Sequence, residues 1–232
     1  MFLMSEKILG VLGGMGPAAS AEFLKILAEK YPAEKDQDHP VVYMISDPKI
    51  PDRGSAIEGK GEDPSPYIIN DLEKLIGWGA GLLAVPCNTA HYFIDRFRDR
   101  IGVPIVHIIE ATVEASMERS AGGAWMISTI GTARSGLYQK AAADRGYRLV
   151  IPPEDVQREI QEAIVFVKSG KMESAARAIE RAVKKLWEIE DLPIVTACTE
   201  LPLAYDASDL PTEKNISSLD ALAEACIRAL TE

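Results

Sequence analysis

Residues 82–89 read Leu-Leu-Ala-Val-Pro-Cys-Asn-Thr, and residues 194–200 read Ile-Val-Thr-Ala-Cys-Thr-Glu. Each stretch is a short apolar run that ends in a cysteine with a threonine close behind it. Continuous apolar runs of this length are typical of strands buried on both faces, as in parallel sheets covered by helices. The two stretches therefore predict an α/β fold with a matching buried strand in each half of the chain.

Strand and helix patterns alternate along the rest of the chain. The strand patterns span Lys7–Leu12, Val41–Ser46, Gly81–Val85, Pro104–Ile108, Ala124–Ser128, Tyr147–Ile151 and Pro193–Thr196. The helical patterns span about Pro17–Lys30, Pro66–Trp78, Thr89–Arg100, Ile109–Arg119, Ala133–Arg145, Pro153–Ser169, Met172–Glu190 and Leu219–Leu230. This order is typical of strand-helix-strand units whose strands run parallel.

The glycine pair at residues 122–123 is the best internal break, because a new strand pattern follows it. We therefore expect two pseudo-symmetric lobes, residues 1–119 and 120–210, each with a mainly parallel sheet flanked by helices. Residues 211–232 are expected to form a C-terminal segment and helix that pack back on the N-terminal lobe. Ligands of open α/β sheets bind at the carboxyl edge of the strands, which predicts an active site in the cleft between the lobes.

Charge balance and cysteine count restrict the partners. The 232 residues carry 25 Lys and Arg against 35 Asp and Glu, a formal net charge of -10, which opposes binding to nucleic acid or an anionic membrane. Residues 1–16 lack a basic lead and a cleavage site, and no window approaches a membrane span, so a first strand is expected there. Three cysteines without an export signal predict a cytoplasmic location and no disulfide framework.

Cys87 and Cys198 both fall at the end of a strand, where free backbone N–H groups and a helix dipole favour the thiolate. A free cysteine in an apolar stretch is more often a small buried side chain, but the matched surroundings favour a shared chemical role. Two thiols that face each other suit removal of a proton from one face of a carbon and its return on the other face. Cys226 shares an apolar helical stripe with Leu219 and Leu222, and is assigned to the core.

Two further motifs each leave two interpretations open. The glycine loop at residues 10–19 either binds an anion or lets a strand and a helix pack closely, and its match to the dinucleotide fingerprint lacks a clear acidic partner. His91, one helical turn after Cys87, either touches that cysteine or packs within its helix. No metal-ligand spacing or Cys-X-X-Cys motif is present, so no metal is expected.

Four motifs together indicate a particular protein family: Gly13–Pro17, Asp47–Arg53, Pro86–His91 and Ala197–Pro202. Together they resemble the aspartate/glutamate racemase family over essentially the whole chain, from about residue 8 to residue 230. The resemblance implies two pseudo-symmetric lobes around a cleft, interconversion of L- and D-amino acids without pyridoxal phosphate, metal or other cofactor, and a homodimer. It also implies an amino acid as substrate, with aspartate favoured.

The same resemblance assigns roles to individual residues. Cys87 and Cys198 match the catalytic pair, and the expected substrate-binding residues are Met15, Gly16, Arg53, Asn88, Thr89, Thr132, Lys168, Thr199 and Glu200. The guanidinium of Arg53 suits a carboxylate because it can bind both oxygens at once, and its alternative role is that of a solvated loop charge. Lys168 follows an apolar helical stripe, and either binds substrate or interacts with the helix dipole.

Two departures from the family pattern bear on the substrate. Gly54 follows Arg53 where a threonine is usual, and Ser46 precedes Asp47 where an asparagine is common. Glutamate or a broader range of amino acids therefore stays open as the substrate, since one methylene changes binding by only about 1–3 kcal/mol. Three further classes of protein compete with an amino-acid racemase: an enzyme of the maleate isomerase or arylmalonate decarboxylase type, a nicotinamide-dependent oxidoreductase and a non-catalytic binding module.

Overall fold

The computed structural model describes residues 7–232 and contains two four-stranded sheets. Every strand pair in both sheets is parallel. The predicted α/β class, with two similar parallel sheets flanked by helices, is confirmed. Residues 1–6, the start of the expected opening strand, lie outside the described residues. Each sheet together with its flanking helices is called a lobe below.

The first sheet has the strand order β2-β1-β3-β4. The elements that build this lobe are β1 (Leu9–Gly13), α1 (Pro17–Lys30), β2 (Val42–Ser46), α2 (Arg53–Ile57), α3 (Ser65–Gly77), β3 (Leu82–Ala84), α4 (His91–Ile94), β4 (Ile105–Val106) and α5 (Ile108–Arg119). Single 3₁₀ turns lie at Asp36–Asp38 and Arg98–Arg100.

The second sheet repeats that order as β6-β5-β7-β8. The elements that follow α5 are β5 (Ala124–Ile127), α6 (Ile130–Ser135), α7 (Leu137–Ala143), β6 (Leu149–Val150), α8 (Glu154–Lys168), α9 (Met172–Ile189), β7 (Ile194–Thr196), α10 (Leu201–Asp206), a 3₁₀ turn (Thr212–Lys214), β8 (Asn215–Ser217) and α11 (Ser218–Thr231). Because each strand has a counterpart four strands later, the loops after β3 and β7 are equivalent, and these loops carry Cys87 and Cys198.

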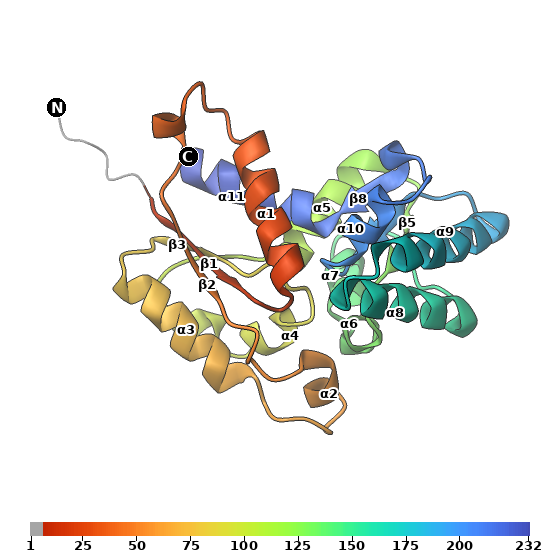
Figure 1. Ribbon diagram of the computed structural model, residues 1–232, viewed down its shortest axis with the longest axis horizontal. Coiled ribbons are helices and arrows are strands. Elements are labelled where there is room, and N and C mark those ends of the chain that lie inside the picture. Colours follow the sequence, from red (N-terminus) through yellow and green to blue (C-terminus); the bar gives the residue numbers. More distant parts are fainter. Residues whose placement is uncertain (1–6) are drawn as a thin grey trace.

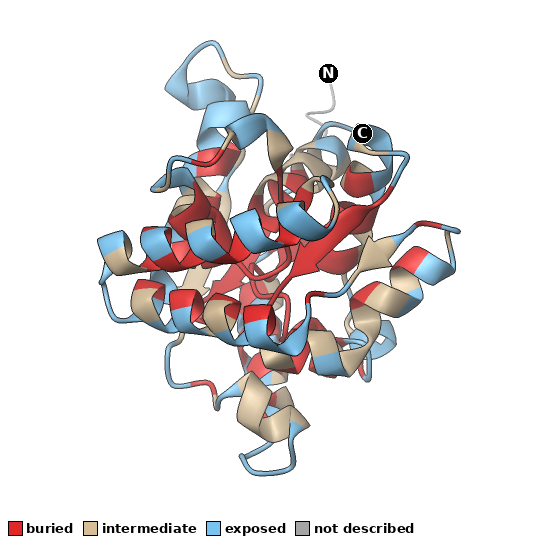
Figure 2. Cartoon of the chain, turned by 90° about the vertical axis from the view of Figure 1, so that its right-hand side faces the viewer, coloured by how far each residue is buried: buried red, intermediate tan, exposed pale blue. Residues whose placement is uncertain are grey.

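Helices cover both sheets, so the inner strands are buried on both faces (Figure 1). Strands β1, β3, β5 and β7 consist of buried residues throughout. The helices keep exposed outer faces around this buried centre (Figure 2). In α9, for example, Ala175, Ile179 and Val183 are buried at a spacing of four residues, which is one stripe of the helix.

Helix α11 runs beside α1 and α5 (Figure 1). Leu222 and Cys226 of α11 are buried in the same apolar cluster as Phe23 of α1, which confirms Cys226 as a core residue. Lys30 at the end of α1 forms a 3.0 Å ion pair with Asp220. The chain therefore returns to the first lobe after β8 has completed the second sheet. The lobe boundaries expected at 119/120 and 210/211 stay a prediction.

Two predicted helices are wrong in extent. The pattern over residues 89–100 forms only α4 and a 3₁₀ turn, because Phe97 leaves the helical region with φ of −139°. The pattern over residues 133–145 forms α6 and α7, which meet at Gly136 with φ of 72°, a left-handed conformation that ends a helix. In both cases apolar residues keep a helical spacing across a break in the backbone.

The glycine loop after β1 allows two chain segments to approach closely. Gly14 has φ of 90°, and a Cβ built on it would clash with the backbone of Asp47, in the loop after β2. Only glycine fits this combination of conformation and contact. A Cβ built on Gly13 would lie 2.7 Å from the Cβ of Ser20 in α1, so the loop also allows the close packing of strand and helix that was one of the two interpretations. Anion binding by this loop stays a prediction. No helix within residues 7–232 combines the length and the apolar character needed to cross a membrane.

Candidate active site

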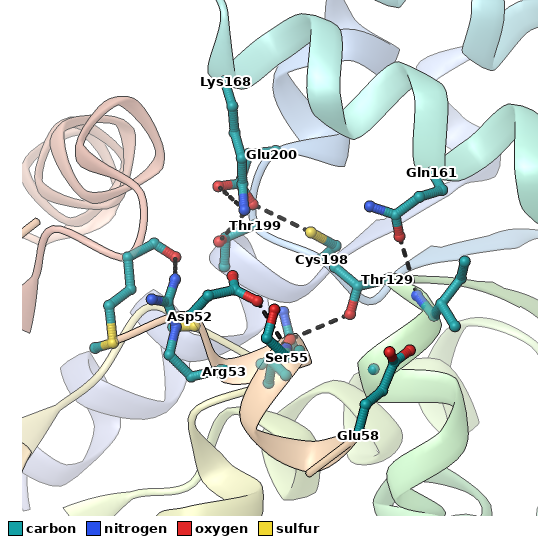
Figure 3. A pocket seen from close by; sticks show the side chains of 17 residues that line it. Asp52, Arg53, Ser55, Glu58, Thr129, Gln161, Lys168, Cys198, Thr199 and Glu200 are labelled. Carbon is teal, nitrogen blue, oxygen red and sulfur yellow. Dashed lines mark hydrogen bonds and ion pairs between the residues drawn. The ribbon is translucent and has the colours of Figure 1, made fainter. Parts of the chain in front are cut away.

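Cys87 and Cys198 line one cavity of about 270 Å³ at the carboxyl edges of the two sheets. Figure 3 shows this cavity from close by, with Cys198 labelled. Each cysteine is only 5% exposed. The side chains around the cavity come from both lobes, so neither lobe forms it alone. The two thiols thus belong to one site although more than a hundred residues separate them in the chain.

Most of the residues expected to bind substrate lie in this cavity. They are Met15, Arg53, Asn88, Thr89, Lys168, Thr199 and Glu200. Gly16 instead lines a neighbouring cavity of about 470 Å³, which also borders Arg53, Lys168 and Glu200. Thr132 is buried beside the site and does not line the cavity.

Arg53 opens the short helix α2, and Asp52 caps that helix by accepting a 2.8 Å hydrogen bond from the Ser55 N–H. The guanidinium donates to the backbone oxygens of Ile50 and Pro51, and these bonds fix its plane at the cavity wall. Burial raises the pKa of Asp52, but the Ser55 hydrogen bonds and the charge of Arg53 outweigh it and leave the pKa below its ordinary value. The cavity therefore presents a fixed cation next to an ionised carboxylate.

Lys168 is the last residue of α8 and reaches the same cavity from the other lobe. Its ammonium lies 3.9 Å from Oε1 of Glu200. Burial lowers the pKa of Lys168, but the nearby Glu200 carboxylate opposes this effect, and the pKa stays above its ordinary value. Two cations, Arg53 and Lys168, are thus available to carboxylate groups of a ligand.

The Cys198 thiol donates a 3.1 Å hydrogen bond to Oε2 of Glu200 (Figure 3). Burial raises the pKa of Cys198, and the Glu200 carboxylate raises it further, so the pKa stands well above its ordinary value despite Lys168. The Glu200 side chain is only 4% exposed. The hydrogen bond to Glu200 and the raised pKa both favour the protonated thiol of Cys198, which is the form that can act as an acid.

The side chains that follow Cys87 form hydrogen bonds with residues of the second half of the chain. Asn88 donates a 3.0 Å hydrogen bond to the Ser218 hydroxyl and accepts one of 2.6 Å from Tyr138. The Thr89 hydroxyl lies 2.8 Å from the Thr132 hydroxyl, which places Thr132 behind Thr89 as its support. These polar side chains hold the two lobes together beside the thiol.

The backbone beside each cysteine keeps free donors. The N–H groups of Asn88, Thr89 and Thr199 form no hydrogen bond within residues 7–232, and all three residues line the cavity. Free N–H groups at the start of a helix or turn bind carboxylate and stabilise oxyanions. The site therefore offers donors on both sides for a carboxylate or for developing negative charge.

Residues 12–226 match the model of the Asp/Glu/Hydantoin racemase family. The chain belongs to this family. It is 30% identical to Picrophilus torridus aspartate racemase, with a TM-score of 0.84 over 97% of this chain and 94% of that one. It is 28% identical to the broad specificity amino-acid racemase RacX of Bacillus subtilis (strain 168), over 88% of this chain and 91% of the relative. A glutamate racemase of Corynebacterium kroppenstedtii (strain DSM 44385 / JCM 11950 / CIP 105744 / CCUG 35717) is 26% identical over 70% of this chain and 57% of its own length.

His91 of this racemase-family chain packs behind the site. Its Nδ1 lies 2.9 Å from the backbone oxygen of Cys87, so Nδ1 carries the proton and the ring holds the backbone of the cysteine loop. Within residues 7–232, Nε2 forms no hydrogen bond. Burial lowers the pKa of His91 to about 3, with the neighbouring His107 adding to the effect. Of the two interpretations of His91, a packing role therefore agrees with these contacts.

The sequence analysis did not assign a site role to several residues that line the racemase-family cavity. They are Asp52, Gly54, Ser55, Glu58, Thr129, Ile130, Gly131 and Gln161. Gln161 lies seven residues before Lys168 on α8, and this spacing puts both residues on one face of the helix. The spacing could therefore have predicted Gln161 as a residue of the site. The Gln161 amide oxygen accepts a 3.1 Å hydrogen bond from the Ile130 N–H, so its NH₂ group is the part left for a ligand.

Within residues 7–232, no three His, Cys, Asp or Glu side chains are arranged to hold a metal ion.

Proposed function

We propose that this chain is a cofactor-independent racemase that interconverts L- and D-aspartate with Cys87 and Cys198 as its two bases. The observation that carries the proposal is that both thiols line one cavity from equivalent loops of the two lobes. A thiolate on one side removes the α-proton, and the thiol on the other side gives a proton to the opposite face, which inverts the centre. Membership of a racemase family supports this class of reaction.

In this mechanism the backbone N–H groups and the two cations bind different parts of the substrate. The free N–H groups of Asn88, Thr89 and Thr199 would hold the α-carboxylate and stabilise the enolate charge that develops when the proton leaves. Arg53 and Lys168 would bind the side-chain carboxylate and fix the α-carbon between the sulfurs. Correct placement of the α-carbon matters because both proton transfers need sulfur within hydrogen-bond reach of it.

Aspartate is supported by the two cations of a small cavity. The 30% identity with Picrophilus torridus aspartate racemase adds to this support. A second candidate is a racemase of broader range. It is favoured by Glu58 and Gln161, which line the same cavity and suit polar or cationic side chains better than a second carboxylate. The similarity to RacX, whose name states broad specificity, supports the same candidate.

The test follows α-proton exchange by NMR in D₂O with L-aspartate, while chiral chromatography measures D-aspartate. The variants are Cys87→Ser and Cys198→Ser, and Cys226→Ser is the matched control because that thiol is buried in the core. We expect exchange and D-aspartate with the natural chain and with Cys226→Ser, and neither with the other two variants.

Different outcomes of this experiment separate the competing functions. Exchange with glutamate, lysine or other amino acids but not with aspartate would keep the two-thiol mechanism and change the substrate. Isomerisation of maleate, or decarboxylation of an arylmalonate, would move the chain to those reaction types. Ligand binding without exchange of any amino acid, unaffected by the cysteine substitutions, would contradict the racemase and favour a binding module.

We also propose that the chain acts as a homodimer in the cytoplasm. Both proposals rest on the resemblance and on the cysteine content, not on a contact within residues 7–232. Light scattering during size-exclusion chromatography measures the mass of the assembly directly. A mass of one chain, 25.3 kDa, at assay concentration would contradict the dimer.

A further inference from the structure

Glu200 forms part of the wall between two cavities. The first is the cavity of about 270 Å³ that holds both cysteines. The second, of about 470 Å³, lies against the start of α1 at Gly16 and Pro17 and also borders Val167 of α8. Arg53, Lys168 and Glu200 line both cavities. Glu200 is therefore placed to exchange a proton with solvent in the second cavity while it contacts the Cys198 thiol in the first.

The two carboxylate oxygens of Glu200 have different partners. Oε2 accepts the 3.1 Å hydrogen bond from the Cys198 thiol. Oε1 is buried, and within residues 7–232 its nearest charged partner is Lys168 Nζ at 3.9 Å, beyond hydrogen-bond distance. A buried carboxylate oxygen requires a hydrogen-bond donor, and the Glu200 side chain also lines the second cavity, which is large enough to hold water.

The other cysteine lacks such a carboxylate. The residue two positions after Cys198 is Glu200, whereas the residue two positions after Cys87 is Thr89. The Thr89 hydroxyl is engaged with the Thr132 hydroxyl at 2.8 Å. Within residues 7–232, Cys87 has no hydrogen-bonded carboxylate. The two pseudo-symmetric thiols thus differ in their access to a proton-carrying group.

A two-base racemase must recover its protons after each turnover. When Cys198 gives its proton to the α-carbon, it becomes a thiolate, and Cys87 becomes a thiol because it has taken the substrate proton. A second turnover in the same direction requires that Cys87 lose its proton to water and that Cys198 take one from water. A thiolate 3.1 Å from a carboxylate is a strongly basic pair, because two adjacent negative charges oppose each other.

We propose, on the basis of the proposed racemase function, that Glu200 returns the proton from solvent in the second cavity to the sulfur of Cys198. The carboxylate takes a proton from hydronium or a buffer acid, which leaves as water or as the conjugate base. The resulting carboxyl group then gives a proton to the thiolate, and the carboxylate is restored. The net change is one proton moved from solvent to Cys198, without any other reactant.

The test uses Glu200→Gln, which keeps the size of the side chain and removes its ability to carry a proton. At saturating aspartate, kcat is expected to fall by about 10²-fold, as for loss of a general acid or base. At low substrate the free enzyme has time to recover the proton, so kcat/KM stays within about threefold. Imidazole at constant ionic strength should restore kcat of this variant by supplying protons through the second cavity. Glu162→Gln, on the exposed face of α8, is the matched control and should keep the natural kcat.

Two results would overturn the proposal. One is a parallel loss of kcat and kcat/KM with no effect of imidazole, which would make Glu200 a substrate ligand or a structural residue. The other is an unchanged kcat at saturating substrate.

A second measurement does not need racemisation, and so separates failure of this proposal from failure of the proposed function. In a chain carrying Cys87→Ser, mass spectrometry follows alkylation of Cys198 by iodoacetamide at pH 8. Replacing Glu200 by Gln removes the negative charge that raises the Cys198 pKa, so alkylation should become several-fold faster. An equal rate with and without Glu200 would show that the carboxylate does not share a proton with the thiol.

Discussion

The Tyr138 hydroxyl donates a 2.6 Å hydrogen bond to the side-chain oxygen of Asn88. Tyr138 belongs to α7 of the second lobe, whereas Asn88 directly follows Cys87 in the first lobe. Both side chains are buried, so water cannot replace the bond if either partner is removed. The position of the Cys87 loop therefore depends on how α7 packs in the second lobe.

Tyr138→Phe is expected to destabilise the fold by about 1–3 kcal/mol, the cost of leaving a buried polar atom without a partner. Denaturant unfolding measures this change. Since the Cys87 loop loses a support, kcat/KM should fall as well. Tyr92→Phe is a control because Tyr92 is partly exposed and its hydroxyl forms no hydrogen bond within residues 7–232. Equal stability of both variants would contradict the role of the Tyr138 contact.

Arg53→Lys separates two roles of the guanidinium. Lysine keeps the charge but cannot present a planar pair of donors, so kcat/KM for both enantiomers should fall by about 10- to 100-fold, as for loss of a charged hydrogen bond. Loss of the bonds to Ile50 and Pro51 should also lower the melting temperature slightly. A lower melting temperature with natural kcat/KM would mean that Arg53 only holds its own loop.

Glu58, which directly follows α2 and lines the cavity, forms a 2.7 Å ion pair with Arg134 of α6. Both are partly exposed, so the pair is weak and sensitive to salt. Arg134→Ala should raise KM by no more than about fivefold and leave kcat unchanged, because the pair holds α2 near the substrate. Steady-state kinetics at low and high salt measure this, and the natural chain in high salt should approach the variant. A kcat effect without a KM effect would contradict the expectation.

His91 predicts a pH dependence of stability. Its pKa is about 3 in the folded chain against an ordinary value of 6.5, so only the unfolded chain binds a proton between these values. The free energy of unfolding should therefore fall as the pH drops below 6.5, by up to about 1.4 kcal/mol per pH unit from this group, with no contribution above 6.5. His91→Asn retains a donor for the Cys87 carbonyl and does not titrate, so its stability should fall less steeply between pH 6.5 and 5. Parallel pH curves for the two chains would contradict this role of His91.

The sequence predicted the fold and the two thiol positions because both depend on local apolar patterns. Cys87 and Cys198 each follow a strand that must be buried, and strand ends in parallel sheets meet at one edge. The family resemblance assigned Lys168 to the site, whereas its place at the end of an amphipathic helix left two roles open. Strand β8 was missed because it reads Asn-Ile-Ser, which has a single apolar residue.

The parts that escaped prediction depend on contacts between distant segments. Helix α2 has only five residues, which is too short for a periodic pattern, so no helix was predicted there and neither Asp52 nor Ser55 was assigned a role. The support of Thr89 by Thr132 joins residues 43 positions apart through side-chain hydroxyls. No single segment of sequence carries information about such a pair. The same holds for the bond between Tyr138 and Asn88.

The return of α11 to the first lobe has a consequence for the order of folding during translation. Leu222 and Cys226 fill a cluster that also contains Phe23 of α1, so this core remains incomplete until residues 218–231 leave the ribosome. Most of the second sheet is synthesised while apolar side chains of the first lobe are still uncovered. A nascent chain stalled before residue 218 would therefore be a preferred client of chaperones that bind exposed apolar surface.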